Sequence, residues 1–291
     1  MSFSVALQLG RVSNLPTVWT NVLVGTVLAG GEPWTPSALL AGIGLSLLYV
    51  SGMYLNDAFD RDIDAKERPA RPIPAGLISA DTVFAAGFGL MLAGLAFVLW
   101  ASAAARPSTG WQPMLAGLGL GAAILFYDWH HKSNVLSPFF MGLCRVLAYL
   151  TAGFAAVRHP SGTLMVAAFV SLCYLIGLTY VAKQESLNRL GSLWPLLFLA
   201  APVAYGSSQL GDGRWAVLPY LIALVTWIGA ALYFLKRRAK GDVPRAVVGL
   251  IAGIALLDAL LLATAGATGA AGFAVLCFLL TLAMQHWVSG T

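Results

Sequence analysis

Charged residues are scarce in this chain, and apolar residues far outnumber them. Of its 291 residues only 10% are charged, whereas 59% are hydrophobic, and the mean hydropathy is +0.80. A soluble domain of this size has too little interior to bury so much apolar surface. The composition therefore excludes a soluble protein. It predicts an all-α polytopic membrane protein, embedded in the lipid bilayer as a single domain over residues 1–291.

Cysteine is also rare, with only Cys144, Cys173 and Cys277 in the chain. All three lie within apolar segments, and their spacing does not match that of a metal site. They are most simply core residues. Neither a disulfide framework nor a cysteine-ligated metal centre is expected.

Long apolar segments, in contrast, fill most of the sequence. Most of them approach the roughly 20 residues that an α-helix needs to cross a bilayer, and a spanning helix satisfies its backbone polar groups internally. The first and seventh segments are short, and the last two are separated only by the small residues at 265–272. Hydropathy gives ten segments, at 15–30, 37–56, 80–103, 111–128, 135–157, 162–182, 192–208, 215–235, 246–266 and 270–288.

The basic residues are distributed unevenly between the loops that join these segments. If the N-terminus is cytoplasmic, the cytoplasmic loops hold most of the Lys and Arg, and the opposite side holds only Arg106, Arg158 and Arg214. This asymmetry follows the positive-inside rule. It explains the net charge of +5 without a nucleic-acid partner. It also places the loop after residue 56 and the loop at 183–189 on the same side.

One stretch departs from the low charge, and it follows the second segment. Residues 56–76 read NDAFDRDIDAKERPARPIPAG. If the preceding helix continues at about 100° per residue, Asp62 points away from the other acidic side chains. The residues that share one face are Asn56, Asp57, Asp60 and Asp64. Three carboxylates and a carboxamide on one face repel one another unless a cation joins them.

These side chains suit a hard divalent cation. All the donors are oxygens, which favours Mg²⁺ over Zn²⁺, and bound Mg²⁺ is usually completed by substrate phosphates. Three prolines between 69 and 74 end the helix in a stiff loop, which places Arg68 and Arg71 near the same phosphates. We interpret the four residues as Mg²⁺ ligands and the three aspartates also as catalytic. The alternative is a solvated loop whose charges serve membrane topology.

The pattern N-D-x-x-D-x-x-x-D at 56–64, followed by R-P-x-R-P-I-P-x-G at 68–76, resembles the first Asp-rich motif of the UbiA family of membrane prenyltransferases. The resemblance implies 9–10 transmembrane helices, nine being usual in that family, around a central cavity open to the cytoplasmic side. It also implies an enzyme that uses Mg²⁺ to transfer a polyprenyl group from an isoprenoid diphosphate to an aromatic or other small lipophilic acceptor. The implied location is the inner or plasma membrane of a prokaryote, with the active-site loops in the cytoplasm.

The opening of the first segment carries a weaker resemblance to the family. A similar Arg–Pro opening implies that Arg11 and Asn21 line the pocket for the diphosphate head group. Alternatively, Arg11 extends from a membrane boundary toward lipid headgroups.

The end of the fourth segment, FYDWHHK over 126–132, is similar to a Tyr-x-x-x-Lys turn of the family. Tyr127, Asp128 and Lys132 match by type, and the resemblance implies that Lys132 contacts diphosphate. The neighbouring His130 and His131 invite a metal site, but adjacent residues on a helix point about 100° apart. We interpret them as a solvated pair at the membrane interface.

Arg145 stands well inside the segment at 135–157. A charge at that depth is costly unless it faces a polar cavity or a partner. We interpret Arg145 as an active-site residue that contacts an anion or the acceptor, the alternative being a structural ion pair. Asp258 is the other charge in mid-segment. It pairs with Arg145 or with a polar helix neighbour, and we assign it no catalytic role.

The region that matches the family's second Asp-rich motif lacks the paired aspartates. It reads LTYVAKQESLNR over 178–189. Tyr180 matches by type, and its ring is our candidate for stabilising a carbocation. Glu185 is the only carboxylate. Three consequences are open: Glu185 binds a second Mg²⁺ alone, Lys183 replaces that ion as a diphosphate ligand, or the chemistry that activates the donor is lost.

The weakened second motif leaves two other functions open. One is a non-catalytic binder or transporter of isoprenoid diphosphates or lipids. The other is an intramembrane terpene cyclase, which ionises the same donor without an acceptor.

Overall fold

The computed structural model describes residues 2–130, 134–187, 194–288 and 290, with the side chains of 184–187 left out. Within these ranges the chain is helical and contains no β-strand. The short 3-10 helices are η1 (Val12–Asn14), η2 (Trp194–Leu199) and η3 (Trp215–Val217). The α-helices are α1 (Phe3–Leu9), α2 (Leu15–Ala29), α3 (Pro36–Phe59), α4 (Arg61–Glu67), α5 (Ala80–Ala104), α6 (Gln112–His130), α7 (Ser137–Ala156), α8 (Gly162–Leu187), α9 (Ala200–Gly211), α10 (Leu218–Arg237), α11 (Asp242–Thr264) and α12 (Thr268–Gln285).

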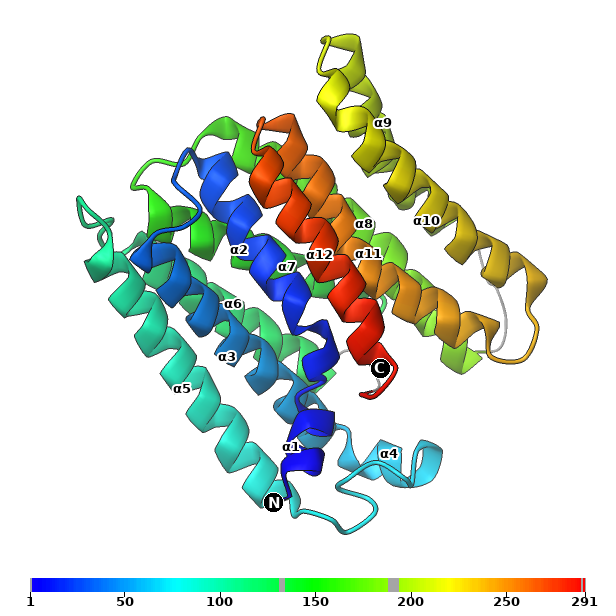
Figure 1. Cartoon of the computed structure of the whole chain (residues 1–291). Helices are drawn as coiled ribbons and strands as arrows, with labels where there is room; N and C mark the ends of the chain where they lie inside the picture. The colour runs from blue at the N-terminus through cyan, green and yellow to red at the C-terminus, as the bar shows by residue number, and fades with distance from the viewer. Residues whose placement is uncertain (1, 131–133, 188–193, 289, 291) are drawn as a thin grey trace.

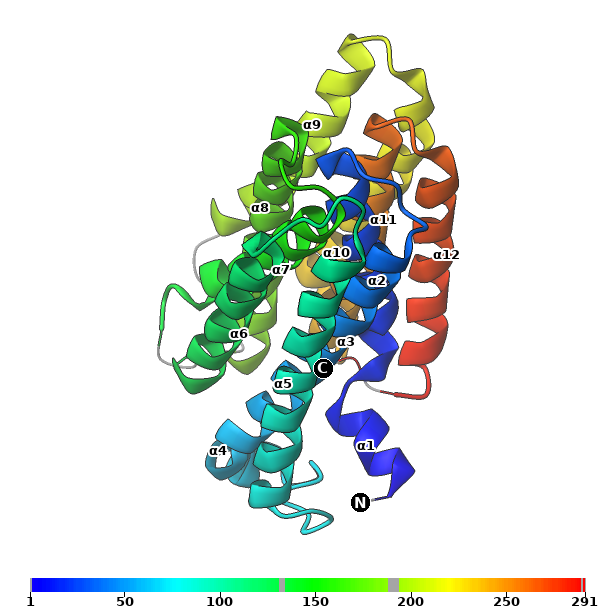
Figure 2. The same cartoon turned by 90° about the vertical axis from the view of Figure 1, so that its left-hand side faces the viewer.

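The long helices lie side by side in a bundle, and the short helices α1 and α4 lie at one end outside it (Figure 1). The connection from α3 through α4 to α5 lies at the same end of the bundle as the N-terminus and α1, as both views show (Figures 1 and 2). The motif-bearing residues 56–76 are therefore gathered at one end of the molecule.

The predicted all-α membrane fold is confirmed, and each of the ten predicted segments is helical where it is described. The last two segments are separate helices, because α11 ends at Thr264 and α12 begins at Thr268. Seven helices in the described ranges are long and apolar enough to cross a membrane, namely α3, α5, α7, α8, α10, α11 and α12. This is fewer than the expected 9–10. The reason is that α2 has 15 residues and α9 has 12, while α6 is less apolar because polar residues occupy both its ends.

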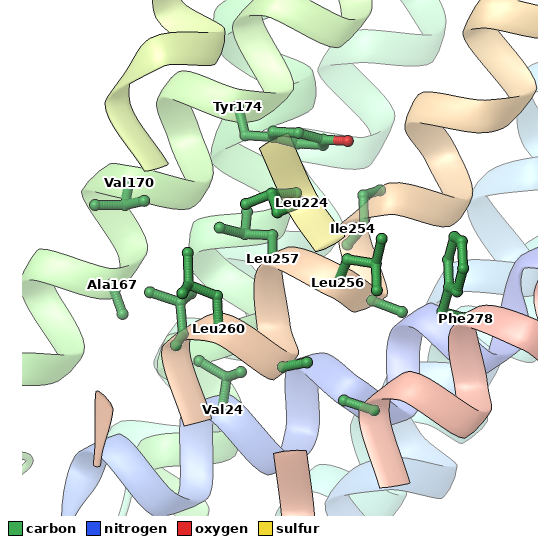
Figure 3. Packing of buried hydrophobic residues seen from close by; sticks show 14 of the residues in the cluster. Val24, Ala167, Val170, Tyr174, Leu224, Ile254, Leu256, Leu257, Leu260 and Phe278 are labelled. Atoms are coloured by element: carbon green, nitrogen blue, oxygen red, sulfur yellow. The ribbon is translucent and has the colours of Figure 1, made fainter. Parts of the chain in front are cut away.

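Helix α11 forms the centre of the larger apolar core. In its most apolar window 83% of the residues are buried, compared with 28% in α5 and in α10. It packs against α2, α8, α10 and α12. Figure 3 shows Leu257 and Leu260 of α11 among Val24 of α2, Val170 of α8 and Leu224 of α10. A second cluster joins α2 and α7 to α3, α5 and α6.

Close helix contacts are made where α2 crosses α7. A Cβ atom built on Gly25 of α2 would lie 2.5 Å from the carbonyl oxygen of Tyr149 and 2.8 Å from the Cβ of Ala152. Small residues that allow backbones to approach are the usual means of helix association in a membrane. Gly25 therefore fixes the distance between α2 and α7, and both helices carry residues of the site described below.

We expect Gly25→Ala to lower the free energy of unfolding by about 1–3 kcal/mol, because the added methyl group forces two backbones apart. The matched control is Gly229→Ala in α10, where a Cβ atom would meet nothing within 4 Å. Thermal unfolding in detergent micelles measures both variants. Equal midpoints for the two variants would contradict the close α2–α7 contact.

Candidate functional site

Helices α2, α3, α6, α7, α8 and α11 surround a cavity of about 580 Å³. The residues that line it recur at helical spacing, such as Leu45, Tyr49 and Asn56 along one face of α3. Leu45 belongs to the α3–α5–α6 cluster, and Leu175 of α8 belongs to the core around α11. The cavity therefore lies where the two apolar clusters meet.

The lining of the cavity is charged at one end and apolar along most of its walls. We call the first part the charged end, and it consists of Arg11, Asn56, Asp60, Glu67, Arg68, Arg71, Asp128 and Lys183. The walls consist mainly of Val18, Leu45, Leu120, Ile124, Ala148, Leu175, Leu178, Val247, Ile251 and Ile254. Such a cavity matches a ligand with an anionic head and an apolar body.

The aspartate-rich run is helical, but the helix is interrupted at Asp60. Helix α3 ends at Phe59, and α4 begins at Arg61. Asp60 itself has φ −81° and ψ −2°, and its carbonyl accepts the backbone N–H of Asp64 at 2.8 Å. The expectation of one continuous helix was therefore wrong at this residue.

The predicted common face survives this interruption. Asn56, Asp57, Asp60 and Asp64 are 8%, 6%, 6% and 2% exposed. The side chain of Asp62 is 83% exposed, as its opposite direction predicted. The residues of this face nevertheless do not have the same surroundings, because Asn56 and Asp60 line the cavity and Asp57 and Asp64 are not part of its lining.

Asp57 and Asp64 bind Arg71, which the proline-rich loop brings back over them. Nη1 of Arg71 lies 2.7 Å from Oδ2 of Asp64 and 3.2 Å from Oδ1 of Asp57. Helix α4 ends at Glu67, immediately before the prolines, as predicted. The two carboxylates hold Arg71 at the cavity wall, where its positive charge is available to a ligand. Arg68 from the same loop also lines the cavity.

Arg11 reaches the same carboxylate from the other side. Its Nη2 donates to Asp57 at 2.9 Å and to the Oδ1 of Asn56 at 3.4 Å. Burial lowers the pKa of Arg11, but Asp57, together with Tyr49 and Tyr127, more than offsets this, and the pKa lies above its ordinary value. The backbone of Arg11 is left-handed, with φ 42°, and its carbonyl accepts the hydroxyl of Tyr49 at 3.2 Å. An unusual backbone held by a tertiary contact is common at functional sites.

Asp128 of α6 contacts this group directly. It is 5% exposed, and its Oδ1 accepts the Nδ2 of Asn56 at 3.2 Å. Its Oδ2 is buried without a hydrogen-bond partner in the described part of the chain. A buried carboxylate oxygen without a hydrogen-bond partner needs an explanation, and one common explanation is a ligand that binds there.

Lys183 lies at the same end and ties α8 to the loop after α6. Its Nζ donates to the carbonyl of Asn134 at 2.7 Å. The contact brings the end of α8 beside the end of α6, as a joint site between the two motifs requires. Lys132 lies outside the described residues, and so does the side chain of Glu185.

Arg145 and Asn21 also line the cavity, and they contact each other. Nη1 of Arg145 donates to Oδ1 of Asn21, while Nδ2 of Asn21 donates to Asp258 at 2.6 Å. Asp258 therefore pairs with polar helix neighbours, and Asn21 stands between it and Arg145.

Tyr180 is a predicted site residue that is not among the residues lining the cavity. The face of α8 that lines the cavity carries Leu175, Leu178, Thr179 and Ala182, and Tyr180 is not part of that lining. The aromatic side chains that do line the cavity are Tyr49 and Tyr127. Helical periodicity fixes the angle between residues of one helix, but the rotation of α8 against its neighbours depends on tertiary packing.

Two carboxylates of the charged end had no role in the sequence interpretation. Asp128 matched the family turn by type only, and Glu67 was one charge among many in the run. Apart from that match, the sequence indicated a role for Asp128 only by placing a carboxylate at the end of an apolar segment. Its contact with Asn56 spans 72 residues, so no local pattern reveals it.

The donors at the charged end fit a hard cation such as Mg²⁺. Asn56, Asp60 and Asp128 supply only oxygens, including the unpartnered Oδ2 of Asp128. In the ranges that the structure covers, no three His, Cys, Asp or Glu residues form a group able to hold a metal by themselves. Such a group is not required for Mg²⁺, which is commonly bound by one or two carboxylates together with substrate phosphates.

Comparisons with known proteins bear on the identity of this site. The profile of the UbiA prenyltransferase family matches residues 18–186. Digeranylgeranylglyceryl phosphate synthase of Methanopyrus kandleri is 26% identical over 279 residues, which cover 89% of each chain. Chloroplastic chlorophyll synthase of Arabidopsis thaliana is 33% identical over 132 residues, which cover 43% of this chain and 33% of that protein.

Two solved structures share the fold. One, from work on digeranylgeranylglyceryl phosphate synthase in membranes, has a TM-score of 0.63 at 19% identity and covers 91% of this chain and 98% of its own. The other, an apo UbiA homolog from Aeropyrum pernix K1, has a TM-score of 0.51 at 16% identity and covers 94% and 95%. The family profile spans more than half of the chain, including the aspartate-rich face and the end of α8. The chain is a multi-pass membrane prenyltransferase and belongs to the UbiA prenyltransferase family.

Proposed function

We propose that this prenyltransferase uses Mg²⁺ to transfer a polyprenyl group from an isoprenoid diphosphate to a small lipophilic acceptor inside the cavity. One observation carries the proposal: the cavity has a charged end that contains both carboxylates and arginines, and its walls are apolar apart from a few polar residues such as Arg145 and Asn21. An isoprenoid diphosphate has the same division into an anionic head and a hydrocarbon tail. The head would lie at the charged end and the tail along the walls.

The basic residues at the charged end would bind the diphosphate directly. Arg11 and Arg71 are held in place by Asp57 and Asp64, so little side-chain freedom is lost when they contact phosphate oxygens. Arg68 and Lys183 line the same end, and Lys132 stays a predicted diphosphate ligand. Because these cations are in place before the substrate binds, they lower the free-energy cost of a charged leaving group inside an apolar bundle.

Asn56, Asp60 and Asp128 would supply protein ligands to Mg²⁺, because their oxygens line the charged end. When bound, Mg²⁺ neutralises charge on the diphosphate and so favours its departure. Asp57 and Asp64 remain predicted ligands as well. Their contacts in the structure support a second role, which is to position Arg11 and Arg71. Glu185 stays a predicted ligand of a second ion.

The apolar walls would protect the reaction once the allylic C–O bond ionises. The allylic carbocation would react with water if water were present, so a cavity closed by aliphatic side chains favours transfer to the acceptor. Tyr49 and Tyr127 line the cavity, and their aromatic rings would stabilise the positive charge. The acceptor then attacks the cation and loses a proton. We further propose that the charged end faces the cytoplasm, because the basic loops gather on that side.

Asp60→Asn tests the aspartate face. We expect pyrophosphate release from geranylgeranyl diphosphate, in membranes with Mg²⁺, to fall by roughly 100-fold or more, because a preorganised charge next to the leaving group is lost. Asp62→Asn is the matched control, since the side chain of Asp62 is 83% exposed and points the other way. Chelation of Mg²⁺ is expected to stop release by the wild-type protein.

The same assay separates the alternative functions. Binding of the diphosphate without release would favour a binder or transporter, and release that yields only cyclised hydrocarbon would favour a terpene cyclase. Release that is unchanged in Asp60→Asn would remove the aspartate face from the proposed chemistry.

Arg71→Gln tests the positioned arginine. The KM for geranylgeranyl diphosphate is expected to rise about tenfold or more, because charge-assisted hydrogen bonds to phosphate are lost. Arg71→Lys keeps the charge without the planar fork and should recover part of the affinity. Arg61→Gln is the control, because Arg61 lies on the outer face with 43% of its side chain exposed. A KM equal to that of the control, in a variant that unfolds at the wild-type temperature, would contradict this role.

A further inference from the structure

The densest run of basic residues in the chain joins α10 to α11. Residues 236–245, which we call the basic turn, read KRRAKGDVPR and contain a single acidic residue. The membrane-spanning helix Trp215–Arg237 ends within the run, and the next one, Asp242–Thr264, begins within it. All the basic side chains of the turn are exposed. The basic turn therefore lies where two helices leave the bilayer, at the level of the lipid headgroups.

Asp242 holds the basic turn in one shape. It is fully buried, and its Oδ2 accepts the Nε of Arg237 at 2.8 Å and the backbone N–H of Ala239 at 2.9 Å. Its Oδ1 accepts the Nη2 of Arg237 at 2.7 Å. A bidentate pair of this kind is the strong geometry for an arginine and a carboxylate. The one negative charge of the run is thus used inside the turn.

The backbone of the basic turn is left-handed at Arg238, with φ 53°, and at Gly241, with φ 85°. Glycine adopts this conformation freely, whereas arginine adopts it only where its surroundings impose it. The N–H of Arg238 bonds to the carbonyl of Phe234 at 3.0 Å. A topology signal requires the charge of a loop but not a fixed backbone. The ordered shape of the turn therefore indicates a role beyond topology.

The ordered turn leaves several positive charges without an anion. In the part of the chain that the structure describes, Lys236, Arg238 and Lys240 have no carboxylate within ion-pair distance. Arg245 lies 3.9 Å from Asp242, at the limit of such a contact. Like charges gathered in this way repel one another, so an anion bound among them is stabilising. Clusters of basic residues next to a membrane span typically attract anionic lipids.

An apolar stripe on the outer face of α10 leads up to the basic turn. Helix α10 lies at the edge of the bundle and packs mainly against α11 (Figure 1). The stripe consists of exposed residues at helical spacing, namely Leu218, Ile222, Val225, Gly229, Tyr233 and Lys236. A Cβ atom on Gly229 would meet nothing within 4 Å, so the middle of the stripe has room for an acyl chain.

Arg237 joins the stripe to the basic turn. Its Cζ lies 5.7 Å from the ring centre of Tyr233 and 5.3 Å from that of Phe234. Exposed tyrosines are enriched at the boundary between membrane and water. Tyr233 thus marks the level at which the apolar stripe gives way to positive charge. A phospholipid has the same order of parts, with acyl chains below a phosphate.

We propose that the basic turn and the outer stripe of α10 bind an anionic phospholipid of the surrounding bilayer. Its phosphate contacts Lys236, Arg238 and Lys240, and its acyl chains lie along the stripe. A lipid fits better than a soluble anion, because the apolar stripe continues directly from the charged turn. The site is independent of the reaction in the cavity, since neither the turn nor the stripe belongs to the cavity lining.

Native mass spectrometry of the purified protein tests the proposal, with phosphatidylglycerol as the anionic probe and phosphatidylcholine as the zwitterionic one. We expect wild-type protein to retain phosphatidylglycerol in preference. Lys236→Gln combined with Lys240→Gln should weaken this binding by about tenfold or more and leave phosphatidylcholine unaffected. The matched control combines Arg106→Gln with Arg158→Gln, which removes the same charge from two other exposed residues. Unchanged binding in the double variant, or an equal loss in the control, would overturn the proposal.

Asp242→Asn separates a built site from general attraction. It keeps every basic residue and raises the net charge, but it removes the carboxylate that holds the turn. A built site predicts weaker binding of phosphatidylglycerol, by about tenfold. Equal or stronger binding would show general attraction and would overturn the ordered turn as the site. If this variant unfolds at a lower temperature than the wild type, the double variant of exposed lysines still decides the question.

Inorganic phosphate distinguishes a lipid from a soluble anion. Under the proposed function, phosphate also binds at the charged end of the cavity, so the difference between wild type and the double lysine variant is what reports on the turn. We expect phosphatidylglycerol to raise the unfolding temperature of the wild type more than that of the double variant, and phosphate to raise both equally. A phosphate effect that depends on the two lysines as strongly as the lipid effect does would overturn a lipid as the occupant.

Discussion

The cost of holding charge inside an apolar bundle governs the rest of this structure. A buried ion must be paired or fully hydrogen-bonded, because it has lost its contact with water. The chain satisfies this requirement in two ways. At the charged end, Asp57 and Asp64 pair with Arg11 and Arg71. Beneath the cavity, Asp258 accepts hydrogen bonds from neutral groups on α2 and α7. Both solutions join helices that are distant in sequence, so the site forms only when the bundle is assembled.

The interruption at Asp60 and the proline-rich loop make the first solution possible. A straight helix would carry Asp64 away from the bundle, whereas α4 leaves α3 at Asp60 and keeps Asp64 2% exposed. The prolines then prevent further helix and return the chain, so that Arg71 contacts carboxylates seven and fourteen residues earlier. Local sequence therefore determines a contact that has the character of tertiary structure. For this reason the sequence alone was enough to predict that the aspartates and Arg71 lie close together.

Where the sequence interpretation succeeded, the information was periodic or local. The ten helical segments, the break before Thr268 and the common face of the aspartates all follow from apolar runs, small residues and angles along one helix. The sequence was less informative about contacts that depend on how one helix is rotated against another. That rotation leaves Asp57, Asp64 and Tyr180 out of the cavity lining and brings Asp128 to Asn56. It also puts Asn21 between Arg145 and Asp258. A single sequence carries no direct signal for such contacts.

The position of Asp128 bears on the loss of paired aspartates near the end of α8. A diphosphate needs compensating charge around it, but the charge need not come from two aspartate motifs. Here the carboxylates at the charged end are Asp60 at the junction of α3 and α4, Glu67 of α4 and Asp128 of α6. Lys183 puts a positive charge on α8, and Arg68 and Arg71 add theirs from the loop. A ligand between these walls would meet a cation-binding side and a basic side. Direct contact with Lys183 would then replace part of what a second metal ion provides, and the degenerate motif would be compatible with an active enzyme.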